Sequence, residues 1–255
     1  MSSFAERLNQ REFLLGTMLT LPSPEIAEMI SKCGFDWLFL DGEHGPATEL
    51  DWQRVMQAVG GRCACVLRVP TCSEVCIKKA LDIGADGIIV PMVNSAEQAR
   101  EAVAWTRYPP QGKRGIGLAR AHGYGLTFSH YLERANDDIA LILQAEHIDA
   151  ANNIDAITEV DGIDAIFVGP YDLSASMGKT GQLQDAEVRR AIVRVTEACK
   201  ERDLPLGYFG VTAESVMPLV DQGYSLVCAG TDADLVTRGA QQIVAEMKAG
   251  TKGTN

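Results

Sequence analysis

The sequence has no apolar run that approaches the roughly 20 consecutive residues a membrane-spanning helix needs. Basic residues are outnumbered by acidic ones, 23 to 34, which gives a formal net charge of −11. Such a surface repels phosphate backbones, so we expect no nucleic-acid partner. The first eleven residues contain no apolar core of a signal peptide. We therefore expect a cytoplasmic protein that binds neither membranes nor nucleic acids.

The sequence also lacks the usual cysteine and glycine motifs of metal and nucleotide sites. The seven cysteines are odd in number and include no Cys-x-x-Cys, so the cluster of Cys63, Cys65, Cys72 and Cys76 is not typical of a zinc site. We interpret the cysteines as reduced and mostly buried thiols. No Gly-x-Gly-x-x-Gly follows the first predicted strand and no P-loop occurs, so no dinucleotide or nucleotide fingerprint is present.

Short apolar runs alternate with longer amphipathic segments along the whole chain. The runs are nearly continuously apolar, as strands buried on both faces must be. They predict strands at 13–19, 37–40, 64–69, 87–90, 140–143, 165–168, 206–209 and 226–229. The other segments predict helices near 24–33, 48–59, 73–83, 95–106, 150–159, 185–202, 213–222 and 232–248. Because a barrel of eight strand–helix units takes roughly 250 residues, we expect a single (β/α)8 TIM barrel domain over residues 1–255.

Two further features of the chain bear on this fold. Four helix-to-strand junctions begin with a glycine, the residue that suits the left-handed position just past a helix end. These are Gly34, Gly84, Gly162 and Gly223. The one long irregular stretch, 108–127, contains Pro109-Pro110 and five glycines. Since long loops are usually functional or mobile, we expect this stretch on the face of the barrel that carries the chemistry.

Candidate metal ligands follow two neighbouring predicted strands. A barrel keeps its active site at the C-terminal ends of the strands, where Glu146 and Asp172 lie. Neighbouring strands are about 4.8 Å apart, so the two carboxylates could meet at one cation. Carboxylates without cysteine favour a hard ion such as Mg²⁺ or Mn²⁺. The alternative is that Glu146 pairs with Arg68 and Asp172 caps a turn.

Three more candidates lie at the same predicted end of the barrel. His44 follows Asp41 by three residues, which lets the carboxylate orient the imidazole as a general base; alternatively, His44 packs on Pro46. Arg68 ends an apolar strand and could hold a carbonyl or carboxylate oxygen, or else form a salt bridge across the mouth. The backbone around Gly169–Asp172 could cradle a carboxylate.

No lysine lies in a predicted strand. Schiff-base catalysis on a carbanion needs a buried lysine of that kind. Carbanion chemistry in this chain would therefore need a metal ion as the electron sink.

Six segments together resemble the HpcH/HpaI aldolase family, whose members are metal-dependent pyruvate aldolases, including aldolases of 2-keto-3-deoxy sugar acids. The segments are Leu40-Asp-Gly-Glu-His-Gly-Pro, Leu67-Arg-Val-Pro, Val90-Pro-Met-Val, Arg107-Tyr-Pro-Pro-Gln-Gly-Lys-Arg-Gly, Leu143-Gln-Ala-Glu and Val168-Gly-Pro-Tyr-Asp-Leu-Ser. They occur in the family's order, and the resemblance spans roughly residues 5–248.

The resemblance implies a role for each matching residue. It implies that Glu146 and Asp172 ligate a divalent ion, which is Mg²⁺, Mn²⁺ or Co²⁺. It implies that His44 is the base with Asp41 as its partner, and that a neighbouring subunit supplies Asp82 to the site. Arg68 is expected to hold the keto oxygen and the developing enolate. The implied substrate-binding residues are Arg68, Gln144, Gly169, Pro170, Tyr171 and Asp172.

The resemblance also implies the reaction and the assembly. A 4-hydroxy-2-keto acid is expected to be cleaved to pyruvate and an aldehyde, or formed from them, in the catabolism of aromatic compounds or sugar acids. The expected oligomer is a hexamer, a trimer of dimers, in which barrels exchange the last helix, here 232–248. Ala145, His147 and the bulky Tyr208-Phe209 depart from the family pattern and leave the aldehyde open, although an aromatic-rich pocket favours a less polar one.

Two alternative functions remain at this point. One is a carbon–carbon lyase of the same superfamily that acts on an acyl-CoA or a phosphoenolpyruvate-type substrate. The other is a non-catalytic relative that binds a keto acid. The first predicts a deep groove with basic residues, and the second predicts loss of the implied catalytic residues.

Overall fold

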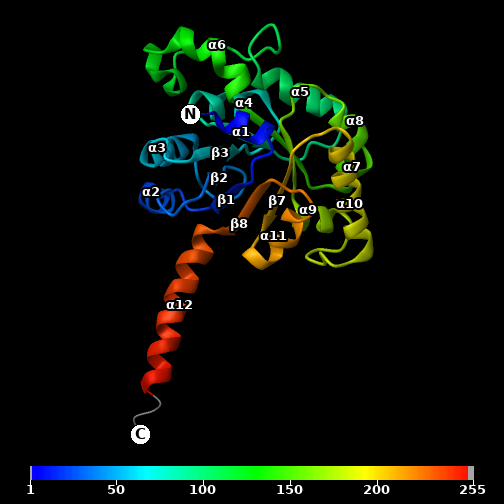
Figure 1. Ribbon diagram of the computed structural model, residues 1–255. Helices are drawn as coiled ribbons and strands as arrows, with labels where there is room; N and C mark the ends of the chain where they lie inside the picture. The colour runs from blue at the N-terminus through cyan, green and yellow to red at the C-terminus, as the bar shows by residue number, and fades with distance from the viewer. Residues whose placement is uncertain (1, 252–255) are drawn as a thin grey trace.

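Eight parallel strands pair in sequence order and close into a barrel in which β8 returns to β1 (Figure 1). The computed structural model describes residues 2–251. The strands are β1 (Leu14–Leu19), β2 (Trp37–Asp41), β3 (Ala64–Arg68), β4 (Gly87–Val90), β5 (Ala140–Ala145), β6 (Ala165–Val168), β7 (Leu206–Gly210) and β8 (Leu226–Thr231). The predicted (β/α)8 barrel and all eight strands are confirmed, and each strand end lies within two residues of its predicted position.

Helices follow the strands and surround the barrel. They are α1 (Phe4–Asn9), α2 (Pro24–Ile30), α3 (Glu49–Val59), α4 (Glu74–Asp82), α5 (Ala96–Thr106), the short 3-10 segment η1 (Arg120–Gly125), α6 (Phe128–Asp138), α7 (Ile148–Asn152), α8 (Ile154–Thr158), α9 (Pro170–Ser176), α10 (Ala186–Glu201), α11 (Ala213–Val220) and α12 (Asp232–Thr251). Four helices begin after a side chain that accepts a hydrogen bond from a backbone N–H of the first turn. These side chains are Ser23 for α2, Ser73 for α4, Ser95 for α5 and Asp185 for α10. The predicted helix 150–159 is two short helices, α7 and α8.

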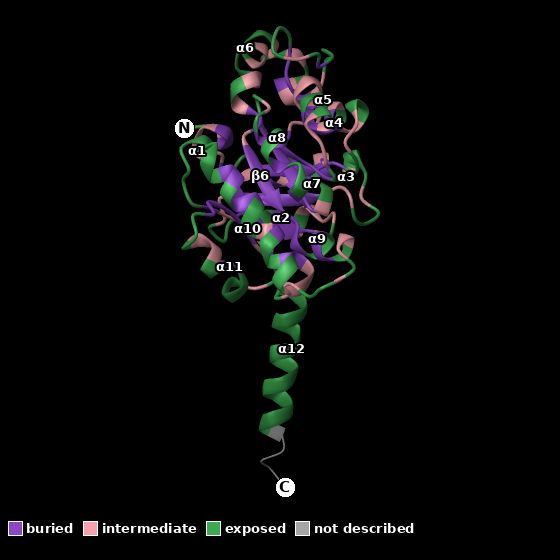
Figure 2. Cartoon of the chain, turned by 90° about the vertical axis from the view of Figure 1, so that its right-hand side faces the viewer, coloured by how far each residue is buried: buried purple, intermediate pink, exposed green. Residues whose placement is uncertain are grey.

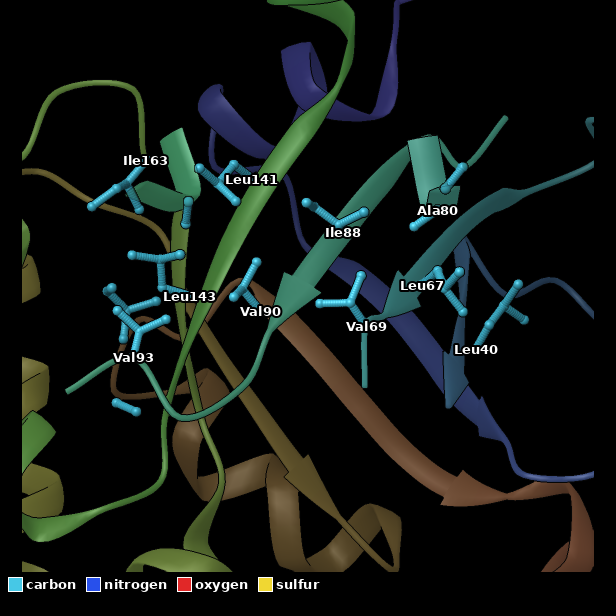
Figure 3. Close-up of a cluster of buried hydrophobic side chains, with 14 of the residues drawn as sticks. Leu40, Leu67, Val69, Ala80, Ile88, Val90, Val93, Leu141, Leu143 and Ile163 are labelled. Atoms are coloured by element: carbon cyan, nitrogen blue, oxygen red, sulfur yellow. The ribbon is translucent and has the colours of Figure 1, made fainter. Parts of the chain in front are cut away.

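Side chains on each strand alternate between the barrel interior and the layer under the helices. In β2, Trp37 and Phe39 point inward, whereas Leu38 and Leu40 belong to the outer layer. Figure 3 shows part of that outer layer, with Leu40, Leu67, Ile88, Val90, Leu141 and Leu143 from successive strands. Inside the barrel, the rings of Trp37, Phe39 and Phe167 pack with centroids 5.7 to 6.3 Å apart. This aromatic core fills the barrel below the C-terminal strand ends.

The long stretch 108–127 lies at the end of the barrel opposite the C-terminal strand ends, so our prediction for it was wrong. Arg114 Nη2 lies 3.0 Å from Oδ1 of Asp82, at the end of α4. Arg120 Nη1 donates to the backbone oxygen of Ile83 at 2.7 Å, just before β4. The reason is topological: the stretch follows α5, which has already returned the chain to the N-terminal end of the strands. In Figure 1 it lies with α6 at the top, far from α9 and α12.

The last helix, α12, extends away from the barrel and is exposed along most of its length (Figures 1 and 2). Its start is anchored, because Asp232 is buried and accepts the backbone N–H groups of Thr20 and Leu21 at 3.0 and 2.9 Å. Its exposed apolar residues are Leu235, Val236, Ile243, Val244 and Met247. Most helical stability in proteins comes from packing an apolar face, and α12 does not pack one on its own barrel. No helix within residues 2–251 is long and apolar enough to span a membrane.

Candidate active site

A pocket of about 200 Å³ opens at the C-terminal ends of the strands. It is lined by Met18, Phe39, Asp41, His44, Arg68, Gln144, Phe167, Gly169, Pro170, Tyr171, Asp172 and Phe209. Polar side chains from β2, β3, β5 and the segment after β6 face apolar ones from β1, β2, β6 and β7. Every residue implied by the sequence lines this pocket except Glu146 and Asp82. Glu146 lies beside Gln144, which does line it.

A larger cleft of about 720 Å³ lies at the opposite end of the barrel, beside the start of β6. Two of its charged side chains, Arg107 and Asp164, pair with each other. Arg107 Nη2 lies 2.7 Å from Oδ2 of Asp164, and Arg107 Nη1 donates to the backbone oxygen of Ile139 at 2.6 Å. These contacts join the N-terminal ends of the strands, so Arg107 and Asp164 serve the fold.

Arg68 and Asp41 form a buried ion pair at the pocket. The two residues are register partners on β3 and β2. Arg68 Nε donates to Asp41 Oδ1 at 3.0 Å, and Nη2 lies 2.9 Å from Oδ2. Burial by itself lowers the pKa of Arg68, but the hydrogen bond and charge of Asp41, with the charge of Glu43, outweigh it and raise the pKa. Arg68 thus pairs across neighbouring strands, with Asp41 and Glu43 rather than with Glu146.

His44 stands at the rim of the pocket with a side chain that is 69% exposed. The backbone N–H of His44 donates to Asp41 Oδ1 at 3.2 Å, and the backbone N–H of Glu43 donates to the same oxygen at 3.1 Å. In the described residues, no hydrogen bond or ion pair joins the Asp41 carboxylate to the imidazole. The carboxylate beside the imidazole is that of Glu43, with Oε2 4.0 Å from His44 Nε2.

Glu146 is buried next to the pocket, and its carboxylate is held from two sides. Oε1 accepts the backbone N–H of Met92 at 2.8 Å, and Oε2 accepts Nε2 of Gln144. Met92 has a φ of 55°, an unusual left-handed conformation for a side chain of its size. Burial raises the pKa of Glu146 to about 7; the charges of Glu43 and Asp172 also raise it, whereas the Met92 amide and Arg68 lower it.

The surroundings of Glu146 fit a hard divalent cation. Two buried acceptor atoms, Gln144 Oε1 and Glu43 Oε2, have no hydrogen-bond donor among residues 2–251. Gly169 leaves this space open, because a Cβ there would lie 2.9 Å from both Gln144 Nε2 and Glu146 Cβ. Carboxylate and amide oxygens are the ligands that Mg²⁺ and Mn²⁺ take. The residues that could hold such an ion are Glu146 and Asp172.

Few protein ligands would surround that ion. Within residues 2–251, no group of three or more His, Cys, Asp or Glu side chains is arranged to hold a metal. An ion on two carboxylates keeps positions for water and substrate oxygens, which Mg²⁺ in particular favours. Asp172 does not cap the helix after β6, since no side chain caps α9 in the structure.

The backbone at the start of α9 faces the pocket. Gly169 precedes the helix and donates its N–H to the backbone oxygen of Ala145 at 3.1 Å, while Pro170 has no N–H. The next N–H groups, of Tyr171 and Asp172, belong to the uncapped first turn of the helix. Such groups suit an anion, so this turn could bind a carboxylate.

The structure does not bring Asp82 to the pocket of its own chain. Asp82 ends α4 at the opposite end of the barrel, where it pairs with the buried Arg114. Glu43 is a polar residue of the site that our sequence reasoning did not single out. Its signal was its place between Asp41 and His44 directly after an apolar strand.

Comparisons with known proteins match almost the whole chain. The family model of HpcH/HpaI aldolase/citrate lyase matches residues 15–239. A 2-keto-3-deoxy-L-rhamnonate aldolase from Escherichia coli (strain K12) is 37% identical over 253 residues, covering 98% of this chain and 94% of that protein. A crystal structure of an HpcH/HpaI aldolase/citrate lyase family protein from Burkholderia cenocepacia J2315 has a TM-score of 0.93 at 32% identity, covering 97% of this chain and all of that one. An HpcH/HpaI aldolase from Desulfitobacterium hafniense DCB-2 has a TM-score of 0.90 at 28% identity, with 97% of each chain covered.

Proposed function

The chain belongs to the HpcH/HpaI aldolase/citrate lyase family, and we propose that it is a metal-dependent aldolase that cleaves 4-hydroxy-2-keto acids to pyruvate and an aldehyde. The same enzyme adds pyruvate to an aldehyde in reverse. The observation that carries this proposal is the meeting of one arginine, two carboxylates and one histidine at the barrel mouth: Arg68, Glu146, Asp172 and His44. The E. coli relative is named for a sugar-acid substrate, which supports a 2-keto-3-deoxy sugar acid as the substrate class.

The residues that would hold a divalent ion are Glu146 and Asp172. Such an ion would supply the electron sink, because it would polarise the oxygens of the keto acid and stabilise negative charge on the enolate. Gln144 holds one Glu146 oxygen and the Met92 N–H holds the other, so the ligand carboxylate keeps a fixed orientation.

Arg68 places a fixed positive charge beside the reacting carbonyl. Two of its nitrogens contact Asp41, and the third, Nη1, lies 3.1 Å from Glu43 Oε2 without hydrogen-bond geometry, so Nη1 is the donor that a substrate oxygen can approach. Phe39 lies under the guanidinium, with Cζ 5.2 Å from its ring centroid, and keeps water from that side. A preorganised donor in a dry pocket stabilises developing enolate charge more strongly than water does.

The remaining residues orient the substrate and move its proton. The first N–H groups of α9, at Tyr171 and Asp172, bind the keto-acid carboxylate. His44 at the rim accepts the proton of the 4-hydroxyl group. The C3–C4 bond then breaks, the aldehyde leaves, and protonation of C3 gives pyruvate.

We also propose that the active assembly is a hexamer whose subunits exchange α12. Support comes from the exposed apolar face of α12, which needs a neighbour to cover it. In such an assembly Asp82 would face the site of a neighbouring subunit rather than its own.

The pocket does not favour the alternative lyase on an acyl-CoA. Its volume is about 200 Å³, and Arg68 is the one Lys or Arg among the residues that line it. A phosphate-bearing cofactor needs more space and more positive charge. A non-catalytic relative is expected to have lost the implied catalytic residues. This chain keeps Arg68, Glu146, Asp172 and His44, so it gives no support to that alternative.

The test is pyruvate release from a panel of 4-hydroxy-2-keto acids, followed through coupled reduction of pyruvate to lactate. We expect turnover with added Mg²⁺, Mn²⁺ or Co²⁺ and none in a chelator. Full turnover in the chelator, or no turnover across the panel with metal, would overturn the proposal.

A further inference from the structure

The two segments that carry the proposed metal ligands are joined on the barrel side of those ligands. Glu146 directly follows β5, and Asp172 lies in the first turn of α9, which follows β6. Gly169 donates its N–H to the backbone oxygen of Ala145 at 3.1 Å. This bond continues the pairing of β5 with β6, so it fixes the points at which the two segments leave the barrel.

A second hydrogen bond joins the same segments beyond the ligands, and it involves a side chain. Ser176, the last residue of α9, accepts the backbone N–H of Ile148 on its Oγ at 3.0 Å. Ile148 is the first residue of α7, and the N–H groups of a first turn have no partner within their own helix. The same Oγ donates to the backbone oxygen of Leu173 at 2.7 Å, so the hydroxyl is held on both sides.

Asp172 depends on this second bond more than Glu146 does. The Glu146 carboxylate is held directly, by the Met92 N–H and by Gln144. The Asp172 carboxylate has no hydrogen bond or ion pair within residues 2–251, so its place is set by the backbone of α9. That helix has only seven residues, and a helix so short keeps its position through contacts with its surroundings.

We propose that Ser176 is a positioning residue that holds the Glu146 and Asp172 carboxylates at a fixed separation. Glu146 lies two residues before Ile148, and Asp172 lies four residues before Ser176, about one helical turn. The two ligands are therefore enclosed between the backbone bond on the barrel side and the Ser176 bond on the outer side. The inference rests on the proposed function and assigns a residue that does not itself touch the ion.

A fixed separation of the ligands affects which ion the site prefers. Mg²⁺ demands near-ideal octahedral geometry with short bonds, whereas Ca²⁺ accepts longer and more variable ones. Without the Ser176 bond, α9 can shift relative to the segment of Glu146, and the ion with the stricter geometry loses more. A purely structural role of Ser176 would lower stability and leave the ratio of the two affinities unchanged.

The experiment measures Mg²⁺ and Ca²⁺ affinity by displacement of Mn²⁺, followed through the electron paramagnetic resonance signal of free Mn²⁺. We expect Ser176→Ala to weaken Mg²⁺ binding about 10-fold, as loss of a partner of a metal ligand does, and Ca²⁺ binding by less than about 3-fold. Ser176→Thr keeps the hydroxyl and should bind Mg²⁺ within about 3-fold of the wild type.

A second variant removes the other partner of the same bond. Ile148→Pro deletes the N–H at the first helical position, where proline is tolerated, and should weaken Mg²⁺ binding as S176A does. The double variant S176A/I148P should bind Mg²⁺ no more weakly than the weaker single variant, because both changes remove one interaction.

Ser31→Ala is the matched control, because Ser31 makes the same kind of bonds at the end of α2, at the opposite end of the barrel. Its Oγ donates to the backbone oxygen of Glu28 at 2.8 Å and accepts Nε of Arg62 at 2.8 Å. S31A and S176A should each lower Tm by about 2–4 °C, the shift expected for one hydrogen bond in a chain of this size. Only S176A should change the affinity for Mg²⁺.

The inference is overturned if S176A binds both ions like the wild type, or if it weakens both equally. It is also overturned if S176T binds Mg²⁺ as weakly as S176A, or if the losses of the two single variants add. A wild type that binds none of the three ions would instead overturn the metal dependence of the proposed function.

Discussion

Asp41 and Arg68 face each other at the ends of β2 and β3 and join through two parallel contacts, Nε to Oδ1 at 3.0 Å and Nη2 to Oδ2 at 2.9 Å. Both residues are at most 5% exposed. A two-point pair of this kind fixes the plane of the guanidinium as well as its position. The third nitrogen, Nη1, is therefore held at a defined point at the edge of the pocket.

Arg68→Lys should lower kcat for pyruvate release about 10²- to 10³-fold, the range seen when a preorganised donor is removed. A lysine keeps the charge but cannot reproduce the two-point contact with Asp41. Arg68→Ala should also lower the free energy of unfolding by about 3–5 kcal/mol, because it leaves a buried carboxylate unpaired. Coupled assays and thermal unfolding give the two values. Arg134→Lys is the control, because Arg134 forms an exposed ion pair. An R68K enzyme as fast as the wild type would contradict the role of Arg68.

Glu146→Gln and Asp172→Asn should each weaken Mn²⁺ binding about 100-fold or more. Substitution of a residue that only hydrogen-bonds to a metal ligand already lowers metal affinity by about 10- to 100-fold. Calorimetric titration of the metal-free protein measures this without reference to activity. Asp149→Asn, at an exposed carboxylate on α7, should bind Mn²⁺ like the wild type. Unchanged affinity in either site variant would mean that the metal lies elsewhere.

Ile243→Asp should disrupt the oligomer, because it places a charge on the exposed apolar face of α12. Size-exclusion chromatography with light scattering gives the mass of the assembly. Gln241→Asp adds the same charge two residues away at an exposed polar position and should leave the mass unchanged. Equal masses for I243D and the wild type would show that this face of α12 makes no essential subunit contact.

The buried cysteines should resist alkylation near pH 8. Burial raises the pKa of Cys63 to about 11 and that of Cys199 to about 12, so about 0.1% or less of either thiol is thiolate at that pH. Cys33 is exposed and should react first with iodoacetamide. The thiolate share rises about tenfold per pH unit below the pKa, so labelling of the buried pair should increase at higher pH or on unfolding. Mass spectrometry of digests taken over time follows each site, and equal labelling rates at pH 8 would contradict this assignment.

The sequence by itself determined the barrel and the general location of its site. Strands covered by helices on one side and core on the other must be apolar on both faces, so they appear as continuous runs such as 87–90 and 165–168, which coincide with β4 and β6. All parallel strands of a barrel end on one face. Residues that directly follow those runs, such as Asp172, therefore meet at that face whatever their separation along the chain.

Tertiary structure alone decided which groups contact each other there. A spacing of three residues allows Asp41 to approach the His44 imidazole, but a neighbouring strand brings Arg68 directly opposite, and a buried guanidinium competes for a carboxylate far more strongly than an exposed imidazole. The stretch 108–127 reached the other end of the barrel because a helix precedes it. Pairing partners and chain direction depend on what lies across from a residue in space, which the order of amino acids along one segment does not specify.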